Sequence, residues 1–190
     1  MSLVVSKHKL KIGLFFGLCC YLAGSVMPCQ AEGPPAEPIL RVETDMHTAF
    51  IKKLSVDRIN HRVVSVSDDK TLRVWDLKTG RLLNTFRIPI TPKGPEGELQ
   101  VGAVSPDGRT VAVGGITGLG WSQHKQNATI YIFDLDTGLV NAVSLPNIPM
   151  VVENLAYSDD GQFLAICLST SKRSALLIYD IVANKFIKII

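Results

Sequence analysis

Two pairs of adjacent carboxylates are the residues whose types and spacing come nearest to acid–base chemistry. They are Asp68-Asp69 and Asp159-Asp160. Two neighbouring carboxylates can divide the roles of acid and base between them. Both pairs, however, lie in turn-type sequences, where Asp is favoured because its side chain bonds nearby backbone N–H groups. We therefore predict that both pairs shape turns and take no part in catalysis.

The remaining residues offer little further chemistry. Cys167 lies in the alternating run FLAICLS (163–169), which predicts a buried strand residue, and no neighbouring His or helix start would activate its thiol. The sequence contains no phosphate-binding glycine loop, no zinc-spaced Cys/His set and no glycine-flanked serine nucleophile. We predict no catalytic residue, no metal site and no cofactor, and hence a protein that is not an enzyme.

Bulk composition adds one exclusion. The 190 residues are 46% hydrophobic and 19% charged, with a net charge of +3, which is typical of a globular protein. Lys and Arg are scattered singly and aromatic residues do not alternate with them. This pattern disfavours nucleic-acid binding.

The elements that must position these residues are short strands that recur three times. Each copy contains an aromatic residue followed by Asp, and these pairs lie 46 to 58 residues apart: SDDKTLRVWDLKTG (67–80), ATIYIFDLDTG (128–138) and SALLIYDIVANK (174–185). A β unit repeated at such a spacing indicates an array of similar sheets. No helical period is evident between the copies.

Turn residues divide each unit into four strands. An inner turn is predicted to need a positive φ at Asn60, Gly108 and Gly161, and a second turn contains Gly80, Gly138 and Asn184, each five residues past its aromatic. Strands joined by tight turns pair antiparallel. The sequence therefore predicts an all-β chain of about three four-stranded antiparallel sheets.

Residues 39–190 resemble the WD-repeat β-propeller family, with blades over about 45–88, 98–145 and 151–190. The resemblance implies four-stranded blades that stack radially and bury their faces against one another. About four to eight blades close such a ring, so we expect this ring not to be closed. An extra strand is predicted at PILRVET (38–44), before the first blade. The chain ends inside the outermost strand of the third unit, so we expect a truncated product or an N-terminal piece.

The resemblance also implies a polar network in the first blade. His47 matches the histidine before the innermost strand, Asp69 the turn aspartate and Trp75 the indole donor, with Ser65 or Ser67 as the strand hydroxyl. A buried indole N–H needs an acceptor, and His can connect a hydroxyl with a carboxylate. We predict that this network is structural. The second and third units lack the histidine and carry Phe133 and Tyr179 in place of tryptophan.

One long loop is the predicted binding face. The second unit carries an insertion, ITGLGWSQHKQN (116–127), between its second and third strands. In a propeller of this topology, Trp121, His124 and Lys125 project onto one face, where an exposed Trp can anchor a partner. The alternative is a Trp121 that folds back over the blade edge and covers apolar surface.

The N-terminus has the organisation of a signal peptide. Lys7, His8, Lys9 and Lys11 precede an apolar stretch over 12–26 and small residues around Cys29-Gln30-Ala31. We predict a signal peptide over 1–31, a Pro-rich spacer over 32–38 and a bacterial-type exported protein, periplasmic or extracellular. After cleavage no stable membrane span remains. A retained anchor, cleavage near Ala23-Gly24-Ser25 and acylation of Cys29 are the alternatives.

The function predicted on this basis is a non-enzymatic protein-interaction scaffold with a protein partner of unknown identity. Residues 38–57 together with 67–83 also resemble the N-terminal propeller of bacterial exported proteins with a downstream caspase-like peptidase domain. That resemblance implies an alternative, a regulatory or substrate-recruiting part whose catalytic domain is absent from this chain. A further expectation is self-association through unpaired blade faces.

Overall fold

The computed structural model describes residues 45–89, 94–117, 128–145, 148 and 150–189. The predicted signal peptide, the spacer and the strand at 38–44 lie outside these residues and stay predictions. The chain divides into a unit over 1–40 and a unit over 41–190, and every described residue belongs to the second. No helix of the described residues is long and apolar enough to cross a membrane.

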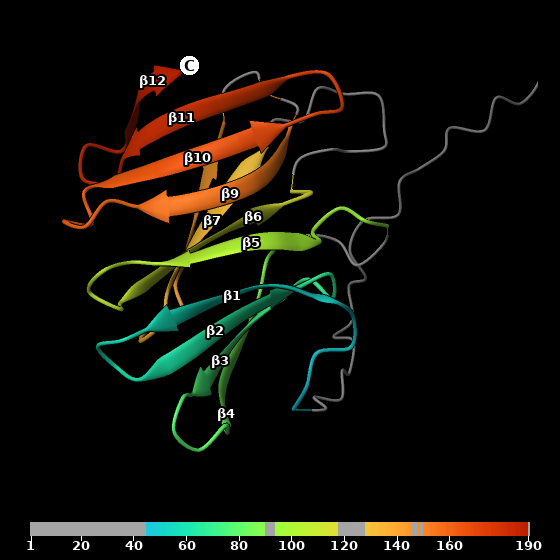
Figure 1. Cartoon of the computed structure of the whole chain (residues 1–190), viewed down its shortest axis with the longest axis vertical. Helices are drawn as coiled ribbons and strands as arrows, with labels where there is room; N and C mark the ends of the chain where they lie inside the picture. The colour runs from blue at the N-terminus through green and yellow to red at the C-terminus, as the bar shows by residue number, and fades with distance from the viewer. Residues whose placement is uncertain (1–44, 90–93, 118–127, 146–147, 149, 190) are drawn as a thin grey trace, which may run out of the picture. The chain divides into compact units, whose positions relative to one another are not determined.

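The described residues form twelve strands in three sheets of the same topology (Figure 1). Blade 1 has the order β1-β2-β3-β4, blade 2 the order β5-β6-β7-β8, and blade 3 the order β9-β10-β11-β12, and every pairing is antiparallel. The bounds are β1 (Ile51–Asp57), β2 (Arg62–Ser67), β3 (Thr71–Asp76), β4 (Leu82–Arg87), β5 (Leu99–Val104), β6 (Thr110–Gly115), β7 (Thr129–Asp134), β8 (Val140–Ser144), β9 (Val151–Tyr157), β10 (Phe163–Ser169), β11 (Ser174–Asp180) and β12 (Lys185–Ile189).

The predicted fold class is thereby confirmed. The described part of the protein is all-β, with three four-stranded antiparallel blades arranged as in a partial β-propeller whose ring is not closed. Each blade is a meander because short turns connect strands that are neighbours in sequence. One connection is longer, the segment between β6 and β7, most of which lies outside the described residues.

The turn that follows each aromatic–Asp pair has the predicted backbone. Gly80, Gly138 and Asn184 have φ of 70°, 74° and 52°. These left-handed values suit glycine and asparagine because neither pays the full steric cost of a larger side chain there. The backbone of this turn was therefore readable from residue type alone.

The prediction for the inner turn was right in two blades and wrong in the first. Gly108 and Gly161 have positive φ, but in blade 1 the left-handed residue is His61, with φ of 51°, and not Asn60. Arg62 pairs with Asp76 as Thr110 pairs with Asp134, so Asn60 holds the position of Gly108 and the left-handed residue of blade 1 lies one position later. The side-chain amide of Asn60 instead donates a hydrogen bond to Asp57 Oδ2 at 3.0 Å.

Apolar side chains fill the space between successive blades. Blade 1 meets blade 2 in a core that includes Val64, Leu72 and Phe133, in which the rings of Phe86 and Phe133 lie 5.6 Å apart. Blade 2 meets blade 3 in a second core that includes Ile130 and Leu164. Burying sheet faces in this way removes apolar surface from water, which is the main favourable contribution to folding.

The position of Cys167 corrects the prediction of a buried cysteine. Leu164, Ile166 and Leu168 of β10 are fully buried toward blade 2, whereas Cys167 points to the opposite face and is half-buried. Side chains alternate between the two faces of a strand, so only one set can meet blade 2. FLAICLS is apolar on both faces, and its sequence does not say which face meets the neighbour.

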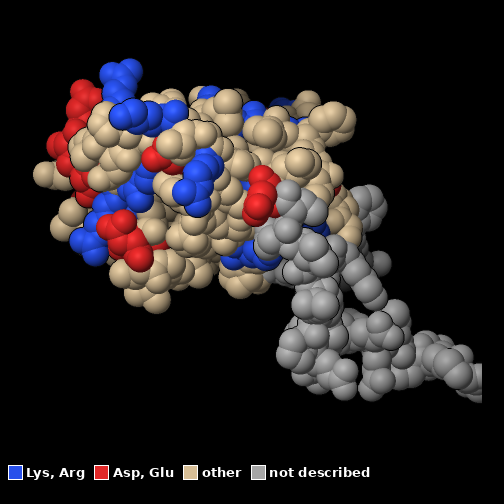
Figure 2. All heavy atoms as spheres, turned by 90° about the horizontal axis from the view of Figure 1, so that it is seen from below, with Lys and Arg blue, Asp and Glu red and all other residues tan. Residues whose placement is uncertain are grey.

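The outward faces of the two end blades also carry apolar side chains. Leu54 and Val56 of β1 are 59% and 52% exposed, and Leu176 of β11 is 36% exposed. Figure 2 looks at the molecule from the blade 1 end and shows basic and acidic side chains interleaved from the left edge to the middle of the view, among uncharged surface. Self-association through these faces stays a prediction.

Candidate functional site

The predicted polar residues of blade 1 lie in one hydrogen-bonded chain. Trp75 Nε1–H donates to Ser65 Oγ at 2.7 Å, Ser65 Oγ lies 2.7 Å from His47 Nε2, and His47 Nδ1 lies 2.9 Å from Asp69 Oδ2. The side chains of His47 and Asp69 are 2% and 6% exposed. Four residues from the segment before β1, from β2, from the β2–β3 turn and from β3 are thus tied together.

Every member of this chain is satisfied by a single arrangement of protons. Ser65 Oγ accepts from the Trp75 indole and donates to His47 Nε2, and His47 donates from Nδ1–H to the Asp69 carboxylate. Satisfying all of these groups matters because an unpaired buried polar group is costly. The network therefore holds the edge of blade 1 without leaving a free donor or acceptor among these contacts.

The Asp69 carboxylate is also the cap of the β2–β3 turn. Burial by itself would raise the pKa of Asp69, but hydrogen bonds from the Thr71 hydroxyl, the Thr48 N–H and His47 outweigh it and hold the pKa below its ordinary value. The carboxylate is therefore ionised at neutral pH, which suits its role as an acceptor for several donors.

Ser67 has a different place from Ser65. Its Oγ accepts the backbone N–H of Asp69 at 3.1 Å, inside the turn, and the structure places Ser65 at the hydroxyl position next to the indole. Asp68 is the residue next to Asp69, and its carboxylate Oδ2 lies 3.0 Å from Lys52 Nζ. In blade 3, Asp160 caps its own turn by accepting from the Gln162 N–H. Asp160 accordingly takes part in turn structure, whereas the side chain of Asp68 pairs with Lys52.

The order Ser65–His47–Asp69 has the distances of a hydrolase triad, but its surroundings differ from those of a nucleophile. Ser65 is 2% exposed, and its Oγ already accepts the Trp75 indole N–H. A nucleophilic Ser needs an accessible Oγ and nearby donors for the oxyanion of the intermediate. A substrate could reach this hydroxyl only by displacing the tryptophan. The geometry therefore supports a structural role.

The predicted binding face, Trp121, His124 and Lys125, lies outside the described residues and stays a prediction. No group of three or more His, Cys, Asp or Glu side chains among the described residues is arranged to hold a metal ion.

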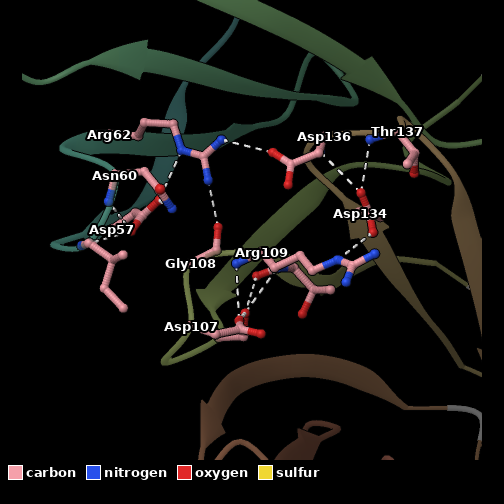
Figure 3. A network of polar contacts seen from close by, with 12 residues as sticks. Asp57, Asn60, Arg62, Asp107, Gly108, Arg109, Asp134, Asp136 and Thr137 are labelled. Atoms are coloured by element: carbon pink, nitrogen blue, oxygen red, sulfur yellow. Dashed lines mark hydrogen bonds and ion pairs between the residues drawn. The ribbon is translucent and has the colours of Figure 1, made fainter.

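A second polar network, which the sequence interpretation missed, joins blade 1 to blade 2 (Figure 3). Arg62 Nε donates to Asp57 Oδ2 at 2.9 Å, its Nη2 donates to the Gly108 carbonyl at 2.6 Å, and its Nη1 lies 3.7 Å from Asp136 Oδ1. The side chain of Arg62 is 14% exposed and that of Asp57 is 1% exposed. One guanidinium thus connects two hairpins of neighbouring blades.

Asp57 anchors this guanidinium. Burial would raise its pKa, but hydrogen bonds from the Asn60 backbone and side chain and from Arg62, together with the Arg62 charge, lower it below its ordinary value. An Asp that ends the alternating segment LSVD (54–57), five positions before an Arg, is the signal that could have revealed this pair.

The arginine in the matching hairpin of blade 2 is Arg109, one position before Thr110, which is the register equivalent of Arg62, and it bonds within its own blade. Arg109 Nε donates to Asp134 Oδ2 at 3.0 Å, and the Arg109 side chain is 63% exposed (Figure 3). Asp134 is the aspartate of the aromatic–Asp signature. Hydrogen bonds from the backbone and side chain of Thr137, assisted by Arg109, lower the pKa of Asp134 to about 2.

Comparison with known proteins agrees with the first blade as a WD repeat. Residues 40–76 match the family model described as WD domain, G-beta repeat, and this segment contains His47, Ser65, Asp69 and Trp75. The match and the sheet topology together support the WD-repeat family and the β-propeller architecture for this chain.

Short segments of curated proteins are also similar. The pre-rRNA-processing protein crb3/ipi3 of Schizosaccharomyces pombe is 36% identical over 63 residues, 33% of this chain and 13% of that protein. A ribosome biogenesis protein BOP1 homolog of Drosophila ananassae is 30% identical over 71 residues, 35% of this chain and 9% of that protein. A probable E3 ubiquitin ligase complex SCF subunit sconB of Arthroderma otae is 40% identical over 40 residues, 21% of this chain and 6% of that protein. The similarity therefore concerns a small part of each relative.

Proposed function

We propose that this chain is a non-enzymatic protein-interaction scaffold. The observation that carries the proposal is that the Ser65–His47–Asp69 hydrogen-bonded chain is buried and bonded to Trp75. Its serine is buried and bonded to an indole, so its polar groups are used to hold a blade. What remains for function is the surface of a rigid β scaffold, whose loops and rims can bind other proteins.

A protein that acts by binding should retain partners only while it is folded. The test is affinity capture with the full chain, compared with a Phe133→Ala variant that removes a buried ring from the core between blades 1 and 2. A partner that the folded chain binds in a purified two-component assay, and the variant does not, supports the scaffold. Turnover of a peptide or ester substrate that Ser65→Ala abolishes, in a protein that remains folded, would overturn it.

We further propose that the scaffold is exported. The support is the sequence of residues 1–31, with its basic start, apolar stretch and small residues before a cleavage point. Expression of the full chain in a bacterium, followed by N-terminal sequencing of the periplasmic fraction, is the test. A mature protein that starts near Glu32 supports export, and an intact N-terminus in the cytoplasm contradicts it.

A place beside a caspase-like peptidase is the finer alternative for the scaffold. It rests on the resemblance of residues 38–57 and 67–83 to the propellers of such proteins. The reading frame downstream of Ile190 decides it. Further blades followed by a His/Cys domain would support the regulatory role, and an unrelated neighbouring gene would remove it.

A further inference from the structure

A cleft of about 460 Å³ lies between blades 2 and 3, on the end of the sheets that carries the β5–β6 and β9–β10 hairpins. Its walls come from both hairpins and from the residue after β11. They include the carboxylates Asp107, Asp159 and Asp160, the phenol of Tyr157, and the apolar side chains Pro106 and Ile181. No Lys or Arg among the described residues lines it.

The equivalent place between blades 1 and 2 is closed. A Cβ built on Gly108 would lie 2.4 Å from Asp57 Oδ1, so the two hairpins there are in direct contact. At the junction of blades 2 and 3 the corresponding glycine is Gly161, and a Cβ built on it would have Pro106 Cδ as its nearest neighbour, at 3.6 Å. The β5–β6 and β9–β10 hairpins at the second junction therefore stand further apart than the β1–β2 and β5–β6 hairpins at the first.

The closed junction shows which chemical group joins such hairpins. There the guanidinium of Arg62 bonds the carboxylate of Asp57 in one hairpin and the carbonyl of Gly108 in the next. By strand register, blade 2 has Ser105 where blade 1 has Asp57, and Thr110 where blade 1 has Arg62, so neither partner of that ion pair is present at the second junction. Arg109 turns instead to Asp134 of its own blade, and no cation from the described residues enters the cleft.

The carboxylates of Asp107 and Asp160 in the cleft are ionised at neutral pH. Hydrogen bonds from the Ser105 hydroxyl and the Arg109 N–H lower the pKa of Asp107, and bonds from the Ser158 hydroxyl and the Gln162 N–H lower that of Asp160. In both side chains these bonds are accepted by Oδ1. Carboxylates gathered on a part-enclosed wall attract a cation more strongly than they would in open water.

Tyr157 adds a neutral polar group. Its hydroxyl lies 3.3 Å from Thr110 Oγ1, and burial raises its pKa to about 12, so the phenol keeps its proton. A planar cation can bond the carboxylates while its aliphatic stem packs on Pro106 and Ile181. Arginine combines a planar donor group with an apolar stem, and it is favoured wherever carboxylates are bound in a shaped site.

We propose that the cleft between blades 2 and 3 binds an arginine side chain of a partner polypeptide, which takes there the place that Arg62 takes between blades 1 and 2. This inference rests on the proposed scaffold function and specifies the chemistry of the partner. The site lies at the end of blade 2 opposite to the β6–β7 connection, since β5–β6 and β6–β7 join opposite ends of the same strand.

The direct test uses N-acetyl-arginine amide as the probe and N-acetyl-citrulline amide as its neutral isostere, titrated into the full chain and followed by amide chemical shifts. We expect the arginine probe to shift the amides of Asp107, Asp160 and Gly161, and to bind roughly tenfold tighter than citrulline because charge-assisted hydrogen bonds are lost with the charge. Equal shifts by both probes, or shifts elsewhere only, would overturn the proposal.

A pair of variants then assigns the effect to the cleft. Asp159→Asn with Asp160→Asn keeps an oxygen for the turn bond of Asp160 but removes two charges, and we expect the arginine probe to bind about five- to tenfold more weakly. The control is Asp45→Asn, which alters an exposed aspartate in a left-handed conformation that Asn accepts. An effect of the control as large as that of the double variant would refute a local site.

The outcome for a captured protein partner separates this proposal from the scaffold function. If the double variant loses that partner, both hold. If the partner binds the double variant as tightly as the wild type, the scaffold stands and the arginine cleft fails. If no partner binds the folded chain while the arginine probe still selects the cleft, the scaffold function fails and the site remains.

Discussion

Blades 1 and 3 share one topology but hold their signature strands with different chemistry. In blade 1, Trp75 is tied through Ser65 and His47 to Asp69, residues from separate parts of the blade. In blade 3, the hydroxyl of Tyr179 donates to Asn184, only five residues further on, and its ring packs on Phe186 at 5.1 Å. The same strand position can thus be secured by a long-range polar network or by a local bond with apolar packing.

This difference predicts which substitutions will lower the stability of each blade. A network of buried polar groups fails as a unit, because removing one member leaves its neighbours unpaired. A packed apolar face instead loses stability in proportion to the volume removed. Blade 1 should therefore be sensitive to polar substitutions and to acid, and blade 3 to cavities.

The largest effect is expected from a cavity in blade 3. Leu164→Ala removes a fully buried side chain from the core between blades 2 and 3 and should lower the free energy of unfolding by about 2–5 kcal/mol. Urea denaturation measures it. Leu83→Ala, at a side chain that is 52% exposed in β4, is the control and should change stability by less than about 0.5 kcal/mol. Equal losses would contradict the location of the core.

A hydroxyl deletion should distinguish the two signature strands. Ser65→Ala leaves both the Trp75 indole N–H and His47 Nε2 without their partner, and should cost about 1–3 kcal/mol of unfolding free energy. Tyr179→Phe removes one local bond and should cost about 0.5–1.5 kcal/mol. Chemical denaturation of both variants measures the difference. If Tyr179→Phe proved the more damaging of the two, the contrast between blades would be reversed.

Arg62 and Arg109, the arginines of the matching hairpins in blades 1 and 2, offer a paired comparison with a smaller expected effect. Arg62→Met removes a 14% exposed guanidinium that joins two blades, and should destabilise the protein by about 1–3 kcal/mol. Arg109→Met removes a 63% exposed guanidinium that bonds within one blade, and no measurable change in the unfolding midpoint is expected. A matched loss for both variants would show that Arg62 has no special role between blades.

Acid should affect blade 1 through Asp69. Because the folded pKa of Asp69 lies below its ordinary value of 3.8, the unfolded chain takes up the proton more readily. The stabilisation is therefore complete well above that value and is lost as the pH falls through the folded pKa. We expect Asp69→Asn to flatten the fall in stability between about pH 5 and pH 2, measured by thermal unfolding in a pH series. A steepness equal to that of the wild type would exclude this contribution.

Local features of the fold were readable from the sequence because they depend on local chemistry. The turns at Gly80, Gly138 and Asn184 follow from which residues accept a left-handed backbone, and the strands follow from alternation. The inner turn of blade 1 was misplaced by one residue because Asn60 is by type the better left-handed residue, yet its side chain is used by Asp57. A tertiary contact decided between two neighbouring residues.

The contacts between blades could not be read in the same way. The sequence alone determined the repeat, the strand order and, through the resemblance of its first unit, the residues of the Trp75 network. Only the tertiary structure decided that Cys167 faces away from blade 2, that Arg62 reaches the Gly108 carbonyl while Arg109 stays in its own blade, and that a cleft opens at the second junction. The physical reason is that alternation and turn chemistry act within a few residues, whereas the face a strand buries depends on which blade packs against it.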